Sequence, residues 1–325
     1  MATLNLIVDD AQAETSTIRS FSLKAAGGDP LPAFSAGAHV NVHVPGLDAP
    51  RSYSLVCLGT DLAAFTAPDR YHLGVHLEDP GTGGSRYMHR VAVGDTLTVD
   101  PPKNDFPVRA AQRGEPPPLL IAGGIGITPI ASMATAFTLQ GRPFHLHYYG
   151  RSRNQMAFVD ALSKQCGTAL HLHFDDEPAT QMALDSLLAS ATPAGHLYIC
   201  GPKAMIDTLV EMAHARGWPQ PNIHVELFTT PVLASGERGF DVELRQSGLT
   251  FHIPPDKSIL EVLIEAGLDP MYDCTRGECG VCQVDVLEGI PDHRDYYLTD
   301  AEKKAGKVMQ ICVSRSFSDK LVIDL

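Results

Sequence analysis

Short runs of β-forming residues occupy the amino-terminal part of the chain. Glycine, proline and aspartate separate these runs at short spacing, and such alternation is typical of an antiparallel sheet. The pattern therefore predicts a small antiparallel β-barrel. The expected strands are Leu4 to Val8, Ser16 to Leu23, His39 to Val44, Arg51 to Leu58 and Tyr71 to Leu77.

The pattern changes after the proline-rich stretch at 114–118. An apolar run leads into a glycine turn and then into a helical pattern that continues to Gln140. The succession recurs and is typical of a parallel α/β sheet, for which nucleotide binding is the default expectation. The expected strands are Leu119 to Ala122, Phe144 to Tyr149, Leu170 to Phe174 and His196 to Cys200, and a further helix is expected from Met205 to Arg216.

Two or three domains are expected, because 325 residues exceed what one hydrophobic core usually serves. A second break in the pattern, from Thr229 to Gly239, precedes a segment the size of a ferredoxin. We expect a β-barrel domain at 1–112, an α/β domain at 113–230 and a third domain at 237–325.

The formal net charge of −13 argues against nucleic acid or an anionic membrane as a partner, because both favour lysine and arginine. Between Glu237 and Leu325 there are seventeen acidic and ten basic residues. This excess is compatible with a docking surface for a basic partner and equally with an ordinary solubilising surface.

The chain has no run of about eighteen apolar residues, and its amino terminus carries acids where a secretory signal has positive charge. We therefore expect a cytoplasmic protein. In that compartment the seven cysteines are not expected to form disulfides, so metal ligation is favoured.

Four cysteines near the carboxyl end have the spacing of a metal centre. Cys274, Cys279 and Cys282 follow the pattern C-x4-C-x2-C, and Cys312 comes thirty residues later, as in plant-type [2Fe-2S] clusters. Small residues such as Gly277 allow the backbone to wrap closely and to direct N–H groups at the sulfides. A zinc site is the alternative, although zinc ribbons favour two C-x2-C pairs and only one is present.

The loop Cys274-Thr-Arg-Gly-Glu-Cys-Gly-Val-Cys282 resembles the cluster loop of plant-type ferredoxins. Placed after a barrel and a nucleotide-binding pattern, it makes the whole chain resemble the phthalate dioxygenase reductase family. The resemblance implies an FMN-binding antiparallel β-barrel domain, an NAD-binding α/β domain with a parallel sheet, and an α+β ferredoxin domain of the β-grasp type, in that order.

The tetrapeptide Arg51-Ser52-Tyr53-Ser54 resembles the R-x-Y-S flavin motif of that family. The arginine can bond a phosphate, the tyrosine can pack on the isoalloxazine, and the Ser54 hydroxyl can reach the flavin N5, where hydride arrives. The alternative is a polar strand with a buried tyrosine. The resemblance implies FMN, and the short chain leaves little room for the adenine-binding part that FAD would need.

A glycine-rich turn downstream offers backbone N–H groups to a phosphate. It contains Gly83, Gly84 and Ser85. Thr82 stands where the family commonly has an arginine, so one phosphate contact differs, and Arg51 and Arg86 are the candidates to replace it.

A second glycine turn resembles the G-G-x-G-x-T-P motif of the ferredoxin reductase superfamily, and a later tripeptide resembles its C-G-P motif. The turn opens a helix, so its amides and the helix dipole can receive a pyrophosphate, although a bare strand-to-helix turn is the alternative. The resemblance places the Cys200 sulfur near the nicotinamide, whereas a buried free cysteine is the simpler reading. The residues are Gly123, Gly124, Gly126, Thr128, Pro129, Cys200, Gly201 and Pro202.

Glu226 and Phe228 resemble the E-x-F end of the family's reductase module, where the aromatic ring lies against the flavin; ordinary strand residues are the alternative. Arg151 and Arg153 could favour the 2′-phosphate of NADPH. The acidic run at 175–177 and the family precedent favour NADH.

The resemblance implies a monomeric reductase component that oxidises NADH at FMN and delivers single electrons through the cluster. Its partner is expected to be a separate Rieske-type oxygenase, an aromatic-compound dioxygenase or demethylase, because no Rieske motif is apparent in the chain. Ser54, Cys200 and Phe228 are the expected catalytic residues. The alternatives are a flavin oxidoreductase with a small-molecule acceptor and a non-catalytic iron-sulfur redox sensor.

Overall fold

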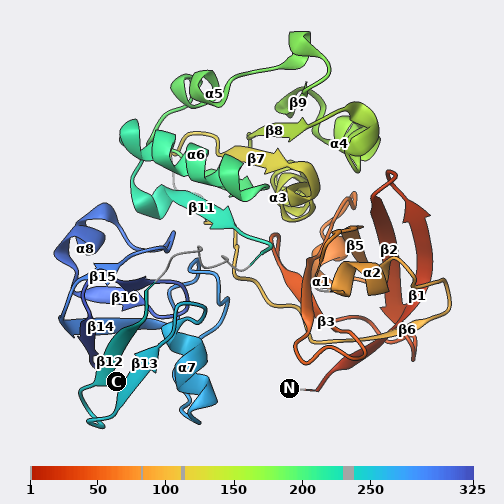
Figure 1. Ribbon diagram of the computed structural model, residues 1–325. Helices are drawn as coiled ribbons and strands as arrows, with labels where there is room; N and C mark the ends of the chain where they lie inside the picture. The colour runs from red at the N-terminus through yellow and green to blue at the C-terminus, as the bar shows by residue number, and fades with distance from the viewer. Residues whose placement is uncertain (1, 82, 111–113, 230–237) are drawn as a thin grey trace. The chain divides into compact units, whose positions relative to one another are not determined.

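A computed structural model describes residues 2–81, 83–110, 114–229 and 238–325. The chain forms two compact units, Met1–Phe228 and Thr229–Leu325 (Figure 1). Thr82, the expected boundary near 112 and most of the expected break at 229–239 lie outside the described residues. Within the described ranges, no helix is long and apolar enough to cross a membrane.

The first unit begins with a six-stranded sheet in the order β4-β3-β6-β1-β2-β5, in which neighbouring strands pair antiparallel. Its interior is lined by alternate apolar side chains such as Leu6, Val8 and Phe21, as a half-buried sheet requires. The antiparallel barrel is thus confirmed. The strands are β1 (Leu4–Ala13), β2 (Ile18–Ala25), β3 (His39–His43), β4 (Arg51–Ser54), β5 (Tyr71–His76) and β6 (Thr96–Val99), with short helices α1 (Ala63–Thr66) and α2 (Gly84–Met88).

The same unit continues with a five-stranded parallel sheet in the order β11-β10-β7-β8-β9. The central strand β7 is buried along its whole length, which explains its unbroken apolar sequence. The strands are β7 (Leu119–Gly123), β8 (His145–Gly150), β9 (Leu170–Phe174), β10 (Leu197–Cys200) and β11 (Ile223–Glu226), and the helices are α3 (Ile127–Leu139), α4 (Val159–Cys166), α5 (Leu184–Ser190) and α6 (Lys203–Ala215).

The barrel and the parallel sheet share one hydrophobic core. Val56 and Phe106, from the barrel segment, belong to the same buried cluster as Ile130, Met133 and Phe137 of helix α3. The two parts therefore form one compact unit, and the boundary between the expected first and second domains stays a prediction.

The second unit contains a mixed five-stranded sheet in the order β13-β12-β18-β14-β16. Strands β12 and β18 pair in parallel, and helix α7 packs its Ile259, Leu260 and Leu263 into the core of this sheet. Ser258 and Glu261 form a capping box that fixes the start of α7. The elements are β12 (Phe240–Leu244), β13 (Thr250–Ile253), α7 (Ile259–Glu265), β14 (Gln283–Glu288), β15 (Pro291–Asp292), α8 (Asp300–Ala305), β16 (Val308–Gln310), β17 (Arg315–Ser316) and β18 (Lys320–Ile323).

Candidate functional site

The four expected cluster ligands lie in the second unit and form two pairs of thiols. Cys274, Cys279 and Cys282 belong to the loop between α7 and β14, and Cys312 follows β16. All four are free of disulfides. The Cys274 and Cys279 thiols are hydrogen-bonded to each other, and so are those of Cys282 and Cys312.

This arrangement fits a two-iron cluster, because such a cluster divides four thiolates between two metal atoms. Among the described residues, no three side chains of histidine, cysteine, aspartate or glutamate are grouped so that they could hold one metal ion. The hydrogen bond from Cys279, followed by the backbone amides of Arg276, Glu278 and Cys279, lowers the pKa of Cys274 to about 5 against the opposing effect of burial. The same hydrogen bond raises the pKa of Cys279, so the pair favours a single negative charge, placed on Cys274.

Close packing holds the cysteine loop in place. Gly280 has φ +78°, and a Cβ there would lie 2.3 Å from the Tyr297 ring, so this position requires glycine. The nearly buried ion pair between Arg276 Nε and Glu278 Oε1, at 2.6 Å, links two residues of the loop. Gln310 accepts a hydrogen bond from Cys282 Sγ at 3.4 Å.

The R-x-Y-S residues form strand β4, as the sequence predicts. Ser54 is buried at the strand end, and burial raises the pKa of Tyr53 to about 12, so that tyrosine stays protonated at neutral pH. A Cβ added to Gly84 would lie 2.6 Å from Arg51 Cγ and 3.2 Å from Tyr53 Oη. The structure thus brings the glycine-rich turn against the R-x-Y-S strand.

Other residues of this region already have protein partners. Arg51 donates from Nη1 to the carbonyl of Ala49 at 2.7 Å, and Ser52 donates to Asn41 Oδ1 at 2.7 Å. Ser85 Oγ accepts from the Glu78 N–H at 3.1 Å. Gly83 precedes α2 with φ +97°. Arg86 forms an ion pair with Asp79. Of the two candidates to replace the family's arginine, Arg51 lies beside Gly84 and Arg86 is ion-paired.

The two nucleotide motifs lie side by side because β7 and β10 pair in parallel, with Ala122 opposite Cys200. A Cβ added to Gly126 would lie 2.2 Å from the Cys200 carbonyl oxygen, and one added to Gly123 would lie 2.7 Å from Pro202 Cδ. A Cβ on Gly201 would lie 3.0 Å from Gly123 Cα. The close approach of the two backbones therefore depends on these glycines.

The glycine turn is a short 3-10 helix, Gly124–Gly126, that leads directly into α3. Thr128 and Pro129 lie in the first turn of α3, where proline is tolerated. Thr128 donates to the Ile125 carbonyl at 3.0 Å, and its methyl group would lie 2.9 Å from a Cβ placed on Gly74 of β5. The turn is thus held against the barrel.

The remaining expected residues lie at the same edge of the parallel sheet. Glu226 ends β11 and is the register partner of Cys200, and both are buried. Phe228, two residues later, is 39% exposed. Arg151 follows β8 and lies near His76 of β5. Burial is the main cause that lowers the pKa of His76, and the positive charge of Arg151 lowers it further. The motif residues of the first unit therefore gather where the sheet edge meets the barrel.

Two buried hydroxyls of α3, Ser132 and Thr135, were not expected from the sequence. They bond to the backbone of the segment that follows Ser54, and they are fully buried. Helix α3 also contains Thr128 and Thr138, so no local signal in the sequence distinguishes Ser132 and Thr135 from the other hydroxyl residues.

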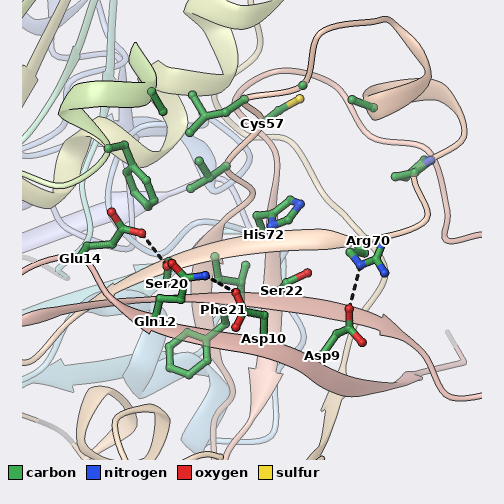
Figure 2. Close-up of a pocket in the computed structure, with 18 of the residues that line it drawn as sticks. Asp9, Asp10, Gln12, Glu14, Ser20, Phe21, Ser22, Cys57, Arg70 and His72 are labelled. Atoms are coloured by element: carbon green, nitrogen blue, oxygen red, sulfur yellow. Dashed lines mark hydrogen bonds and ion pairs between the residues drawn. The ribbon is translucent and has the colours of Figure 1, made fainter. Parts of the chain in front are cut away.

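A cavity of about 940 Å³ lies in the first unit (Figure 2). It is lined by strands β1 and β2 and by the start of α4, with Asp9 bonded to Arg70 and Glu14 bonded to Ser20. Its lining also includes Cys57, three residues after the end of β4, and Arg153. The cavity therefore adjoins the candidate site.

Comparison with known proteins identifies the family of the chain. Residues 120–211 match the model of an oxidoreductase NAD-binding domain, and residues 242–316 match that of a 2Fe-2S iron-sulfur cluster binding domain. The chain is 34% identical over 328 residues to the vanillate O-demethylase oxidoreductase of Acinetobacter baylyi, with 100% of each covered. It is 38% identical over 313 residues to the phthalate dioxygenase reductase of Burkholderia cepacia, covering 95% of this chain and 93% of that relative. The chain belongs to the phthalate dioxygenase reductase family.

A solved structure agrees with this assignment. The phthalate dioxygenase reductase described as a modular structure for electron transfer from pyridine nucleotides to [2Fe-2S] superposes with a TM-score of 0.67 and 36% identity, covering 100% of this chain and 98% of that one. The predicted combination of barrel, parallel α/β sheet and ferredoxin fold is confirmed. As a member of the phthalate dioxygenase reductase family, the chain is an iron-sulfur oxidoreductase with an NAD-binding domain.

Proposed function

We propose that the chain oxidises NADH, divides the electron pair at bound FMN, and delivers single electrons through a [2Fe-2S] cluster to a separate Rieske-type oxygenase. The observation that carries this proposal is the division of the four cysteines into two thiol pairs, in a chain that also carries an NAD-binding domain. Flavin supplies the chemistry that accepts a hydride and releases electrons one at a time. A plant-type cluster near roughly −400 mV can reduce a Rieske centre at about −150 mV or higher.

The R-x-Y-S strand and the glycine-rich turn are proposed to hold the flavin. Arg51 binds the phosphate, with the backbone of Gly83, Gly84 and Ser85 beside it. The Tyr53 ring packs on the isoalloxazine and the Ser54 hydroxyl bonds the N5 region. The packing of Gly84 against Arg51 and Tyr53 supports a single site for ring and phosphate, and membership of the phthalate dioxygenase reductase family favours FMN over FAD.

The sheet edge is proposed to bind NADH. The amides of the glycine turn and the start of α3 receive the pyrophosphate, while Cys200 and Glu226 line the nicotinamide position and Phe228 covers the flavin until the nucleotide enters. The buried register pairing of Cys200 with Glu226, and the exposure of Phe228 beside them, support these roles. The residues of the turn and of the adjoining strand end are Gly123, Gly124, Gly126, Thr128, Pro129, Gly201 and Pro202.

The choice of NADH over NADPH rests on the surroundings of the two arginines. The N–H of Asp175 donates to the Gly150 carbonyl at 3.0 Å and that of Asp176 to the Arg151 carbonyl at 3.2 Å, so the acidic run lies beside Arg151. Arg153 Nη2 is bonded to Asp160 at 2.9 Å. Arg153 is therefore paired with a carboxylate, and the backbone of the acidic run lies beside that of Arg151. Both features favour NADH, because a nearby carboxylate repels a 2′-phosphate.

Replacing Asp175 and Asp176 together with asparagine is expected to raise kcat/KM for NADPH about tenfold and to change that for NADH less than about threefold, because repulsion of the 2′-phosphate is weakened. Steady-state kinetics with both nucleotides measure this. Asp185→Asn, which removes a carboxylate paired with Arg216 on the surface, is the matched control. Equal use of both nucleotides by the unaltered chain would contradict the assignment of NADH.

The acceptor is proposed to be an oxygenase, because the relatives described above are named as an O-demethylase oxidoreductase and a dioxygenase reductase. The acidic excess between Glu237 and Leu325 would suit a basic docking surface on that partner. We further propose that the chain acts as a monomer in the cytoplasm.

Anaerobic titration of the purified protein with NADH tests the proposal. We expect a flavin spectrum overlaid on that of an iron-sulfur centre, bleaching of both on reduction, and a paramagnetic signal from the reduced cluster. Heat-released flavin should be FMN, and metal analysis should give two irons and two labile sulfides per chain. Zinc in place of iron and sulfide would refute the proposal.

A further inference from the structure

Helix α3 is bonded to the segment that continues the R-x-Y-S strand. The Cys57 N–H donates to Ser132 Oγ at 2.8 Å, and Ser132 Oγ donates to the Leu55 carbonyl at 2.5 Å. Ser132 is fully buried. One hydroxyl therefore holds two backbone groups of the three residues that directly follow Ser54.

Thr135 makes the next contact, three positions along the same face of α3. Its Oγ1 donates to the Cys57 carbonyl at 2.5 Å and accepts from Gln165 Nε2 at 2.8 Å. Thr135 is also fully buried. The backbone N–H and the backbone carbonyl of Cys57 are thus both bonded to hydroxyls of α3. The side chains around them form an apolar core cluster. Buried hydroxyls are costly unless bonded, so the four bonds form a closed polar network in the shared core.

The same helix begins at the nucleotide turn. Gly126 immediately precedes α3, and Ser132 lies six residues later, about 9 Å along a rigid helix. At its start α3 meets the Cys200 strand end, and two turns on it holds the continuation of β4. A single rigid element therefore connects the nucleotide-binding turn to the strand that carries Tyr53 and Ser54.

We propose that Ser132 and Thr135 are positioning residues that set the distance between the flavin strand and the nucleotide turn for hydride transfer. The inference rests on the proposed function and deepens it. Hydride transfer requires the donor carbon and the acceptor atom to lie about 3 to 3.5 Å apart, and a displacement of about 1 Å costs about a hundredfold in rate. Loss of the three bonds that join Ser132 and Thr135 to Leu55 and Cys57 would let the 55–57 segment shift relative to α3.

The kinetic test uses the full chain with bound flavin. The double variant Ser132→Ala with Thr135→Val is expected to slow flavin reduction at saturating NADH about tenfold in stopped-flow measurements, while KM for NADH and flavin content stay within about twofold. Thr138→Val is the matched control, because Thr138 lies on the same helix, is exposed, and donates only to the Ala134 carbonyl of its own helix at 2.9 Å.

Two single variants separate hydrogen bonding from packing. Thr135→Ser keeps the hydroxyl and loses a methyl group, whereas Thr135→Val keeps the shape and loses the hydroxyl. The positioning role predicts a rate near that of the unaltered chain for Thr135→Ser and a slower rate for Thr135→Val. The opposite order would overturn it. Both changes are small enough for the fold to persist.

A second readout needs no flavin. In the flavin-free protein, amide hydrogen exchange at Cys57 is expected to accelerate at least tenfold in Ser132→Ala. Exchange at Val56, whose N–H donates to the His72 carbonyl within the barrel at 2.8 Å, should not change. Equal acceleration at both amides would mean general loosening of the barrel and would overturn the specific link.

The outcomes distinguish the inference from the proposed function. Failure of the unaltered chain to reduce ferricyanide with NADH would overturn the proposed function, and the positioning role with it. Normal activity in the unaltered chain together with an unchanged rate of flavin reduction in the double variant would overturn the positioning role alone.

Discussion

Replacing Cys312 with serine is expected to lower NADH-dependent reduction of cytochrome c at least a hundredfold, while reduction of ferricyanide stays within about twofold. Cys312 is the partner of Cys282 in one thiol pair and comes from a different segment than the other three cysteines, so its loss leaves the cluster without a closed set of four thiolates. Ferricyanide accepts electrons directly from flavin and bypasses the cluster. The two assays, run on one preparation, measure the difference.

Cys166→Ser is the matched control, because Cys166 ends α4 in the other unit and belongs to neither thiol pair. It should retain both activities and full iron and sulfide. If Cys312→Ser reduced cytochrome c as fast as the unaltered chain and kept its labile sulfide, the cluster would have other ligands and the proposed site would be contradicted.

Replacing Gly126 with alanine is expected to lower kcat/KM for NADH about a hundredfold. The added Cβ would lie 2.2 Å from the carbonyl oxygen of Cys200 and 2.4 Å from its carbonyl carbon, and neither backbone can yield without moving the turn or the strand. A displacement of about 1 Å at this place separates the nucleotide from the flavin. The variant should still bind flavin, since Arg51 and Tyr53 lie on the barrel.

Gly124→Ala is the comparison for this prediction. Gly124 has φ +54°, and nothing lies within 4 Å of its added Cβ, so the change costs about 1 kcal/mol of backbone strain without a clash. We expect a lower melting temperature and a kcat/KM for NADH within about fivefold of the unaltered chain. An equal loss in both variants would mean that turn conformation, and not the approach to Cys200, controls nucleotide binding.

Elements with a regular hydrophobic period could be predicted from the sequence. Strand β9 has the predicted bounds, β7 is one residue longer than predicted, and α3 ends one residue before the expected Gln140. Strand β4 ends at Ser54 and not at Leu58, because the following residues bond to α3 and to neighbouring strands and leave the regular ladder. Strand β6, Thr96–Val99, was not expected, since four residues give too short an alternation.

In the candidate site, too, only residues with a local sequence pattern could be predicted. The four cysteines and the glycine motifs could be identified from local spacing, because their chemistry requires fixed offsets. Ser132 could not, since its partners Leu55 and Cys57 are 77 and 75 residues away. The neighbourhood of Arg151 and Asp176 depends on the parallel pairing of β8 with β9, which only the fold reveals.

The shared core of the barrel and the parallel sheet has a mechanical consequence. Domains joined by a small polar interface move readily relative to each other. An interface filled with buried apolar side chains such as Val56, Met133 and Phe137 resists both rotation and hinge opening. The unit that would bind the nucleotide and the flavin is therefore expected to move as one rigid body, with the barrel and the parallel sheet kept at a fixed separation.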